Sequence, residues 1–279
     1  MEKITFDEIK KALIRSGYLL ENRVLNFFND NQFDAESSHR YVIDEVEGKF
    51  REIDVLATAN LASNSTNKTN ITLFVNFYVE CINNPVPLAL FCSYGDREEP
   101  TTDWAYNFIN GSPQFLEFCS ESFPQVIYDR QNEIIKSMPA RQYCGFIMKK
   151  DKNIDEKWMA NHPDDFHQTL SKLSQFVKIK KSDTKERWEE IRPDFTRLEI
   201  FIPLIVLQGE MIEIINQKEL ELKDIEYYRL KAPYEKGYNK SLSIDIVTEK
   251  YLKTYLDLKV TGLINMFDDL NSLINSNFE

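Results

Sequence analysis

The stretch that decides the fold is "ITLFVNFYVECINN", residues 71–84. Side chains alternate between the two faces of a β-strand, and the odd-numbered positions from 71 to 81 are all apolar. We therefore expect a strand over 71–82 with one face buried in the core. The even-numbered face is mixed, and Glu80 lies at its end beside Ile82.

The preceding segments predict a β-hairpin. "SHRYVIDEV" (38–46) and "KFREIDVLATAN" (49–60) have strand composition and flank a turn at Glu47-Gly48. Alternation along the second strand assigns two faces. One face carries Ile53, Val55 and Ala57, and the other carries Phe50, Glu52, Asp54 and Leu56. Asp54 thus occupies a mid-strand position where aspartate is disfavoured, unless the strand is an edge strand with a solvated face.

Two helices are expected at the N-terminus. Thr5 and Glu8 have the spacing of a capping box, which predicts a short helix ending near Ser16-Gly17. A second helix carries "YLLENRVLNFF" (18–28), in which Glu21 begins an i, i+4, i+7 series with apolar residues. Glu21 then shares a face with core residues. The alternative is that Glu21 lies at the wet margin of a helix that is apolar around most of its circumference.

Three strands in meander order would place Asp54 and Glu80 on one face of a sheet. The second helix, packed across that sheet, would bring Glu21 near them. Three convergent carboxylates form a hard-oxygen site that suits Mg²⁺ or Mn²⁺.

In the order helix, strand, strand, strand, the acids in "GYLLENRVLNFF", "REIDVLA" and "FYVECINNP" resemble the restriction-endonuclease-like PD-(D/E)XK nuclease superfamily. The core of that family runs αβββαβ, and its metal is held by the strand-two aspartate and the strand-three acid, often assisted by a helix glutamate. The resemblance implies that Asp54 and Glu80 are catalytic metal ligands and that Glu21 supports them.

One position departs from the family pattern. The family places a lysine two residues after the strand-three acid, where it orients the attacking water and offsets phosphate charge, but this chain has Ile82 there. Ile53 also replaces the proline that often precedes the aspartate. Four residues are candidates for the missing polar group, although a structural role is the simpler reading of each: Lys49, Arg51, Tyr78 and Asn83. By alternation the first two face away from Asp54, unless a bulge turns them.

The rest of the chain completes the same core. "PDDFHQTLSKLSQFVKIKK" (163–181) predicts an amphipathic helix whose apolar stripe includes Phe166, Leu170, Leu173 and Val177. The apolar strand "RLEIFIPLIVLQG" (197–209) follows, and a βαβ unit sets it parallel to the Glu80 strand.

We therefore predict an α/β fold with a mixed central sheet and one elaborated domain spanning 1–279. Its core comprises 1–83 and 163–208. Residues 84–162 form a long insertion with strand-like segments at 87–93 and 142–150, and 209–279 form an extension of strands and a terminal helix.

Composition bounds the class of protein. A chain of 279 residues with 42% hydrophobic side chains can bury a large core, which argues against disorder. A net charge of −11 argues against a protein that coats DNA or RNA, and leaves only local basic patches, at 148–152 or 177–181, for nucleic-acid contact. Such lysine runs are more commonly solvated helix ends. With no signal peptide and no run long enough to cross a bilayer, we expect a cytoplasmic protein without membrane contact.

Small polar motifs add no further site. The cysteines are too few and too scattered for a disulfide framework or a Cys-x-x-Cys metal site. The histidines, His39, His162 and His167, lack the spacing of a helical zinc pair.

Two functional hypotheses follow. The first is a metal-dependent nuclease, weak or partner-activated, that hydrolyses phosphodiester bonds. The second is a catalytically inactive nuclease fold that acts as a binding or assembly subunit of a nucleic-acid-processing or defence complex, which the loss of the lysine would explain. A third reading treats the acids as ordinary strand and helix residues.

Overall fold

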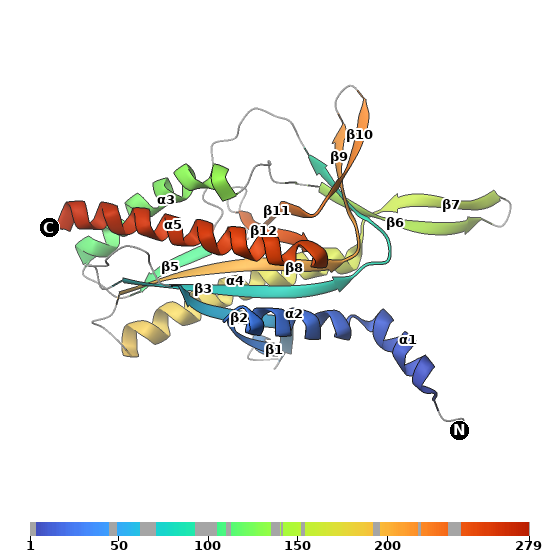
Figure 1. Ribbon diagram of the computed structural model, residues 1–279, viewed down its shortest axis with the longest axis horizontal. Coiled ribbons are helices and arrows are strands. Elements are labelled where there is room, and N and C mark those ends of the chain that lie inside the picture. Colours follow the sequence, from blue (N-terminus) through green and yellow to red (C-terminus); the bar gives the residue numbers. More distant parts are fainter. Residues whose placement is uncertain are drawn as a thin grey trace.

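A mixed sheet forms the centre of the molecule (Figure 1). The computed structural model describes residues 4–44, 49–61, 71–92, 105–109, 113–134, 140, 142–151, 154–191, 196–216, 219–233 and 241–278. The strand order is β1-β2-β3-β8-β12-β11, and β5 pairs with β8 beside this path. Its strands are β1 (Asp34–Asp44), β2 (Lys49–Leu61), β3 (Ile71–Asn83), β5 (Ala105–Ile109), β8 (Thr196–Gln208), β11 (Tyr227–Pro233) and β12 (Ser241–Thr248).

The pairing of β3 with β8 confirms the parallel arrangement expected from the sequence. Their register runs without interruption from Ile71↔Thr196 to Asn83↔Gln208. β1, β2 and β3 form the expected antiparallel meander. The turn expected at Glu47-Gly48 lies outside the described residues.

Helices cover both faces of this sheet (Figure 1). They are α1 (Phe6–Ser16), α2 (Tyr18–Asp30), α3 (Pro113–Ile134), α4 (Asp164–Ile191) and α5 (Leu252–Phe278), the last preceded by a 3₁₀ turn at Glu249–Tyr251. The odd-numbered residues of β3 pack with α2, α3 and α5 in one core, while Tyr78 packs with α4 in a second core. All four residues predicted for the apolar stripe of α4 are buried. None of the helices in the described ranges has the length and apolar character needed to cross a bilayer.

α1 has the predicted ends but an unexpected environment. Thr5 and Glu8 form the capping box, and Gly17 ends the helix with a left-handed φ of 81°. The apolar face of α1 is exposed, however, and Phe6 retains 92% of its accessible surface. Figure 1 shows α1 extending away from the central sheet, so only its last turn lies near α2.

A second sheet lies at one end of the molecule, with strand order β10-β9-β4-β6-β7 (Figure 1). Its strands are β4 (Leu88–Cys92), β6 (Gln142–Asp151), β7 (Ile154–Asn161), β9 (Met211–Asn216) and β10 (Leu220–Ile225). We expected the strands after residue 209 to extend the central sheet, which is correct for β11 and β12 but wrong for β9. β9 pairs instead with β4 of the insertion, because β12 occupies the edge of β8.

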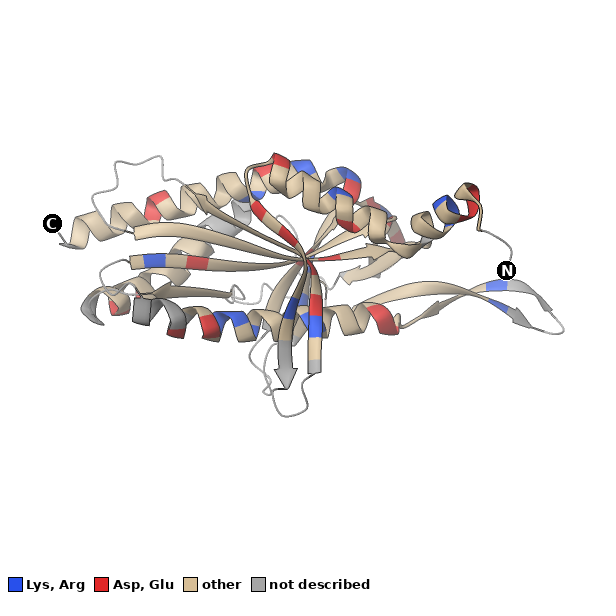
Figure 2. Ribbon diagram, turned by 90° about the horizontal axis from the view of Figure 1, so that it is seen from below, with Lys and Arg blue, Asp and Glu red and all other residues tan. Residues whose placement is uncertain are grey.

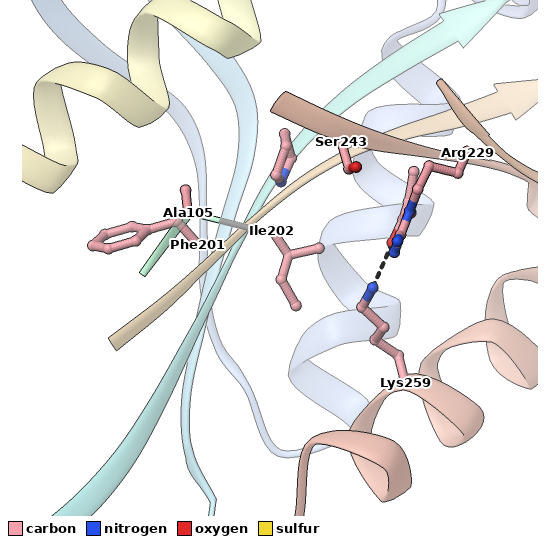
Figure 3. Close-up of a pocket in the computed structure, with 8 residues that line it drawn as sticks. Ala105, Phe201, Ile202, Arg229, Ser243 and Lys259 are labelled. Carbon is pink, nitrogen blue, oxygen red and sulfur yellow. Dashed lines mark hydrogen bonds and ion pairs between the residues drawn. The ribbon is translucent and has the colours of Figure 1, made fainter. Parts of the chain in front are cut away.

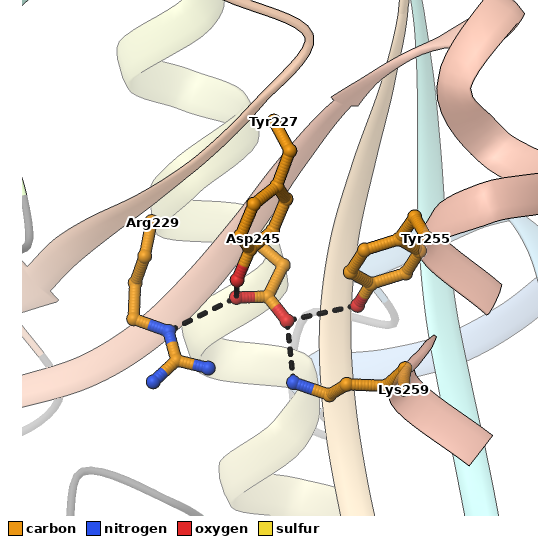
Figure 4. Close-up of polar contacts among 5 residues, drawn as sticks. All are labelled: Tyr227, Arg229, Asp245, Tyr255 and Lys259. Carbon is orange, nitrogen blue, oxygen red and sulfur yellow. Dashed lines mark hydrogen bonds and ion pairs between the residues drawn. The ribbon is translucent and has the colours of Figure 1, made fainter. Parts of the chain in front are cut away.

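A buried carboxylate ties α5 to the sheet. Asp245 of β12 accepts hydrogen bonds from four side chains, as Figure 4 shows. The donors are Tyr227 (3.1 Å), Arg229 (3.0 Å), Tyr255 (2.8 Å) and Lys259 (2.7 Å). Two cations outweigh the cost of burial, and the pKa of Asp245 lies well below its ordinary value.

A small cavity lies beside this cluster. It is lined by Arg229, Asp245 and Lys259 together with Ser243 and Ile202 (Figure 3). Its charged walls already contact one another, since the Lys259 ammonium contacts the Asp245 carboxylate (Figure 3). The cluster is therefore a structural anchor between β11, β12 and α5.

We predict that Asp245→Asn lowers the free energy of unfolding by about 3 to 5 kcal/mol, because it leaves two buried cations beside a neutral amide. Urea denaturation followed by circular dichroism measures this change. Asp257→Asn is the matched control, since Asp257 forms an exposed ion pair with Lys253 and should change stability by about 0.5 kcal/mol or less. Equal effects of the two substitutions would contradict the assigned anchor.

Candidate functional site

The candidate site lies where β2 and β3 separate. Their pairing ends at Val55↔Val79, although both strands continue and β3 remains paired with β8. In place of a backbone partner, the Asp54 carboxylate accepts a hydrogen bond from the Cys81 backbone N–H at 2.8 Å. Asp54 and Glu80 therefore come together at the point of separation, as the sequence predicts.

The regular alternation of β2 breaks at Asp54. Opposite it on β1, Ser38 has a left-handed φ of 57°, and the pairing resumes on either side as Ser37↔Val55 and His39↔Ile53. Val55 belongs to the core under α2 and α5, whereas Ile53 belongs to the core under α4. The expectation that Ile53 shares a face with Val55 is thus wrong, because the irregularity turns both strands over.

Glu80 is buried and keeps one carboxylate oxygen unsatisfied. It is 4% exposed, and its Oε2 contacts the ammonium of Lys172 on α4. Its Oε1 has no hydrogen-bond partner in the described parts of the chain. Burial, together with the nearby charge of Asp54, raises the pKa of Glu80 to about 8, although Lys172 acts in the opposite direction.

The three predicted acids are electrostatically coupled. Burial raises the pKa of Asp54, and the hydrogen bond from Cys81 opposes that shift. Glu21 is half-buried on α2, where burial and then the charge of Asp54 raise its pKa. Glu21 therefore lies at the margin of the core, close enough to Asp54 to interact with it. Within the described ranges, no three acidic, histidine or cysteine side chains converge closely enough to form a preassembled metal centre.

Lys172 of α4 is the cation that contacts Glu80. It lies between Leu170 and Leu173 of the buried stripe, so its aliphatic stem follows the core while its ammonium reaches Glu80. The sequence signal for this lysine is weak, because it is simply a polar residue at the edge of an amphipathic helix. Only the placement of α4 across the sheet brings it to the acid.

The other candidates for the missing group have different roles. Tyr78 is buried between Phe176 and Phe201 and belongs to the core. The Asn83 side chain donates to the Ile14 carbonyl at 2.8 Å and connects β3 to α1.

The remaining two candidates, Lys49 and Arg51, lie on β2. The side chain of Lys49 lies outside the described residues. Arg51 lies directly opposite Tyr41, which belongs to the core under α4. That Arg51 faces away from Asp54 stays a prediction.

The three histidines contact residues other than Glu21, Asp54 and Glu80. His39 contacts Glu36, and His167 is hydrogen-bonded to the Tyr143 hydroxyl at 3.0 Å beside His162. None of them belongs to a metal-binding group in the described structure.

Glu80 differs from the other buried carboxylate, Asp245, in its free bonding capacity. Both Asp245 oxygens accept two donors each, which leaves no position for a ligand. The buried Glu80 Oε1 lacks any protein donor in the described residues, and such an atom is costly in a fold unless something outside the chain satisfies it. The Asp54–Glu80 pair is therefore the better candidate for chemistry.

Comparisons of the chain with protein-family models, with curated proteins and with solved structures find no match. The assignment of function therefore depends on the residues of this site.

We predict that wild-type stability falls relative to Glu80→Gln as the pH rises from about 5 to about 8. With a folded pKa of about 8 and an ordinary value of 4.5, the folded protein holds one more proton than the unfolded chain in this window, so rising pH favours unfolding. Urea denaturation of both proteins at several pH values measures the difference. A constant difference across the window would show that the pKa of Glu80 is not raised.

Proposed function

We propose that this chain is a PD-(D/E)XK-like metal-dependent nuclease that hydrolyses phosphodiester bonds. The observation that carries the proposal is the state of Glu80: a buried carboxylate with one oxygen in contact with Lys172 and the other without a protein partner. The order α2, β1, β2, β3, α4, β8 supports it, since it follows the αβββαβ order of that superfamily.

The donor set at this site suits a hard divalent cation. Glu80 Oε1 and the Asp54 carboxylate are the oxygens that would hold Mg²⁺ or Mn²⁺, and Glu21 would assist from α2. When bound, such an ion supplies charge neutralisation at the phosphate and lowers the pKa of an attacking water. Burial raises the pKa of Glu80, and a bound cation would lower it, so metal binding would release a proton from this carboxyl group.

Two protein side chains, Asp54 and Lys172, have separate roles in the proposed reaction. The Asp54 carboxylate is oriented by the Cys81 N–H, which holds it at the point where β2 and β3 separate. Lys172, on α4, contacts Oε2 of Glu80. Its ammonium can donate to a phosphate oxygen or to the attacking water. In this role Lys172 replaces the lysine that the superfamily carries on the strand itself. Such positioned donors stabilise charge that develops in the transition state.

A specific observation favours a second candidate. Lys172 already contacts Glu80, and the described residues contain no preassembled three-ligand group. Both features suit a nuclease fold that has lost catalysis and serves as a binding or assembly subunit. Metal binding and cleavage distinguish the two candidates.

We predict that the wild-type chain binds Mn²⁺ and cleaves DNA or RNA, and that Asp54→Ala abolishes both activities because it removes one of the two ligand carboxylates. Isothermal titration calorimetry measures binding, and plasmid DNA and RNA cleavage are assayed in the same buffers. Glu121→Ala, which removes an exposed acid on α3, is the control. Metal binding without cleavage would favour the second candidate, and absence of binding would refute the metal site.

A second prediction concerns the displaced lysine. Lys172→Met should lower the cleavage rate by about 100-fold, the typical cost of removing one transition-state donor, while Mn²⁺ binding persists. Ile82 lies beside Glu80 on β3 and packs on the α4 side, so Ile82→Lys should restore part of the rate in the Lys172→Met background. In the wild-type background the same substitution should bring little gain. If Lys172→Met cleaves at the wild-type rate, the lysine has no catalytic role.

A further inference from the structure

Basic side chains lie around an aromatic platform on the α4 side of the central sheet. The platform consists of Tyr41 on β1 and Phe176 on α4, whose ring centroids are 4.5 Å apart in an edge-to-face contact. Both side chains are buried, and the Tyr41 hydroxyl donates to the Lys172 carbonyl at 3.4 Å. The platform therefore joins the edge of the central sheet to the turn of α4 that carries Lys172.

Two cationic groups lie beside this platform. Arg51 is exposed and lies directly opposite Tyr41 in the β1–β2 pairing, and the Lys180 ammonium lies 5.5 Å from the centre of the Phe176 ring. Lys172, Phe176 and Lys180 follow one another at four-residue intervals on α4, so they share one side of that helix. In Figure 2 the basic positions of α4 lie near those at the ends of β1 and β2.

The sequence offered two basic segments for nucleic-acid contact, and the fold separates them. Segment 177–181 belongs to α4 and places Lys180 over the Phe176 ring, eight residues beyond Lys172, whereas Lys181 turns toward Tyr106 of β5. Segment 148–152 belongs mainly to β6, in the hairpin that projects from the second sheet (Figure 1). The two segments thus lie on different surfaces, and substitutions in each can be tested separately.

We propose that Arg51 and Lys180 hold the phosphodiester backbone of a nucleic-acid strand and lead it past Glu80 and Lys172. The proposal rests on the nuclease function proposed above. Arg51, Lys172 and Lys180 give three positive charges on the α4 side of the sheet, in a chain with a net charge of −11. Nearby acids limit the patch at its borders, since Glu36 contacts His39 and Asp183 follows Lys180 by three residues.

The contact between Lys180 and Phe176 favours phosphate binding over a solely structural role. A side chain already held by an aromatic ring loses less conformational freedom when it binds a phosphate oxygen, which improves affinity. Arg51 is exposed, and the fork of donors that a guanidinium carries suits phosphate. The patch lies on the same side of the sheet as the free Oε1 of Glu80, so a bound backbone would pass the acid that requires a ligand.

The test uses the full chain and the double variant Arg51→Gln/Lys180→Gln. Fluorescence anisotropy with labelled single-stranded DNA, duplex DNA and single-stranded RNA measures affinity at several salt concentrations, in EDTA so that no cleavage occurs. The loss of two phosphate contacts should weaken binding and reduce the slope of log K against log salt by about 1.4 for single strands or about 1.8 for duplex DNA. The preferred nucleic acid is the one that shows the largest change.

Lys149→Gln/Lys157→Gln is the matched control. These exposed lysines face each other across the β6–β7 hairpin, so the variant loses the same charge at a remote surface. We expect wild-type affinity and slope from this control, and circular dichroism checks that both variants fold. Equal losses in the two variants, an unchanged slope in Arg51→Gln/Lys180→Gln, or no binding by the wild type would overturn the proposal.

Failure of this proposal is distinguishable from failure of the nuclease proposal. If the wild type cleaves nucleic acid in Mn²⁺ and Arg51→Gln/Lys180→Gln binds as tightly, the backbone track is wrong and the nuclease stands. If binding depends on Arg51 and Lys180 but no metal-dependent cleavage occurs, the track stands and the chain is a nucleic-acid-binding subunit.

Discussion

The parallel pairing of β3 with β8 is the constraint on which the rest of the structure depends. β8 is buried along nearly its whole length, and its register with β3 runs through thirteen residue pairs. A parallel pair cannot be joined by a tight turn, so α4 has to cross the sheet before β8 begins. That crossing brings Lys172 to Glu80. β12 and β5 pair with successive halves of β8, so the same strand also positions Asp245 and the helix α5.

The two faces of the sheet use buried carboxylates in opposite ways. Under α5, Asp245 accepts four hydrogen bonds, and its low pKa reflects complete compensation by two cations. Under α4, Glu80 contacts one cation and its pKa is raised to about 8. A saturated buried acid stabilises a fold, whereas an unsaturated one is a cost that a ligand can remove. This contrast, more than the number of acids, separates the candidate site from the structural cluster.

A local irregularity in β1 and β2 places the candidate site between the core under α2 and α5 and the core under α4. The left-handed Ser38 and the unpaired Asp54 turn β1 and β2 over at one point. On the side of Val55, the two strands contribute to the core under α2 and α5. On the other side, Ile53 and Tyr41 belong to the core under α4, and Arg51 lies opposite Tyr41. The same break leaves the Asp54 carboxylate free to accept from Cys81.

The sequence by itself determined the local elements and one pair of neighbours. The apolar period of residues 71–82, the capping box at Thr5 and the stripe of α4 all predicted elements correctly, because alternation and helical spacing are local properties. The adjacency of Asp54 and Glu80 followed from meander order. Only the tertiary structure decided that Lys172 contacts Glu80, that Ile53 changes face, and that β9 joins a second sheet. Those contacts join residues far apart in the chain, or depend on a single left-handed residue, and no periodic pattern encodes either.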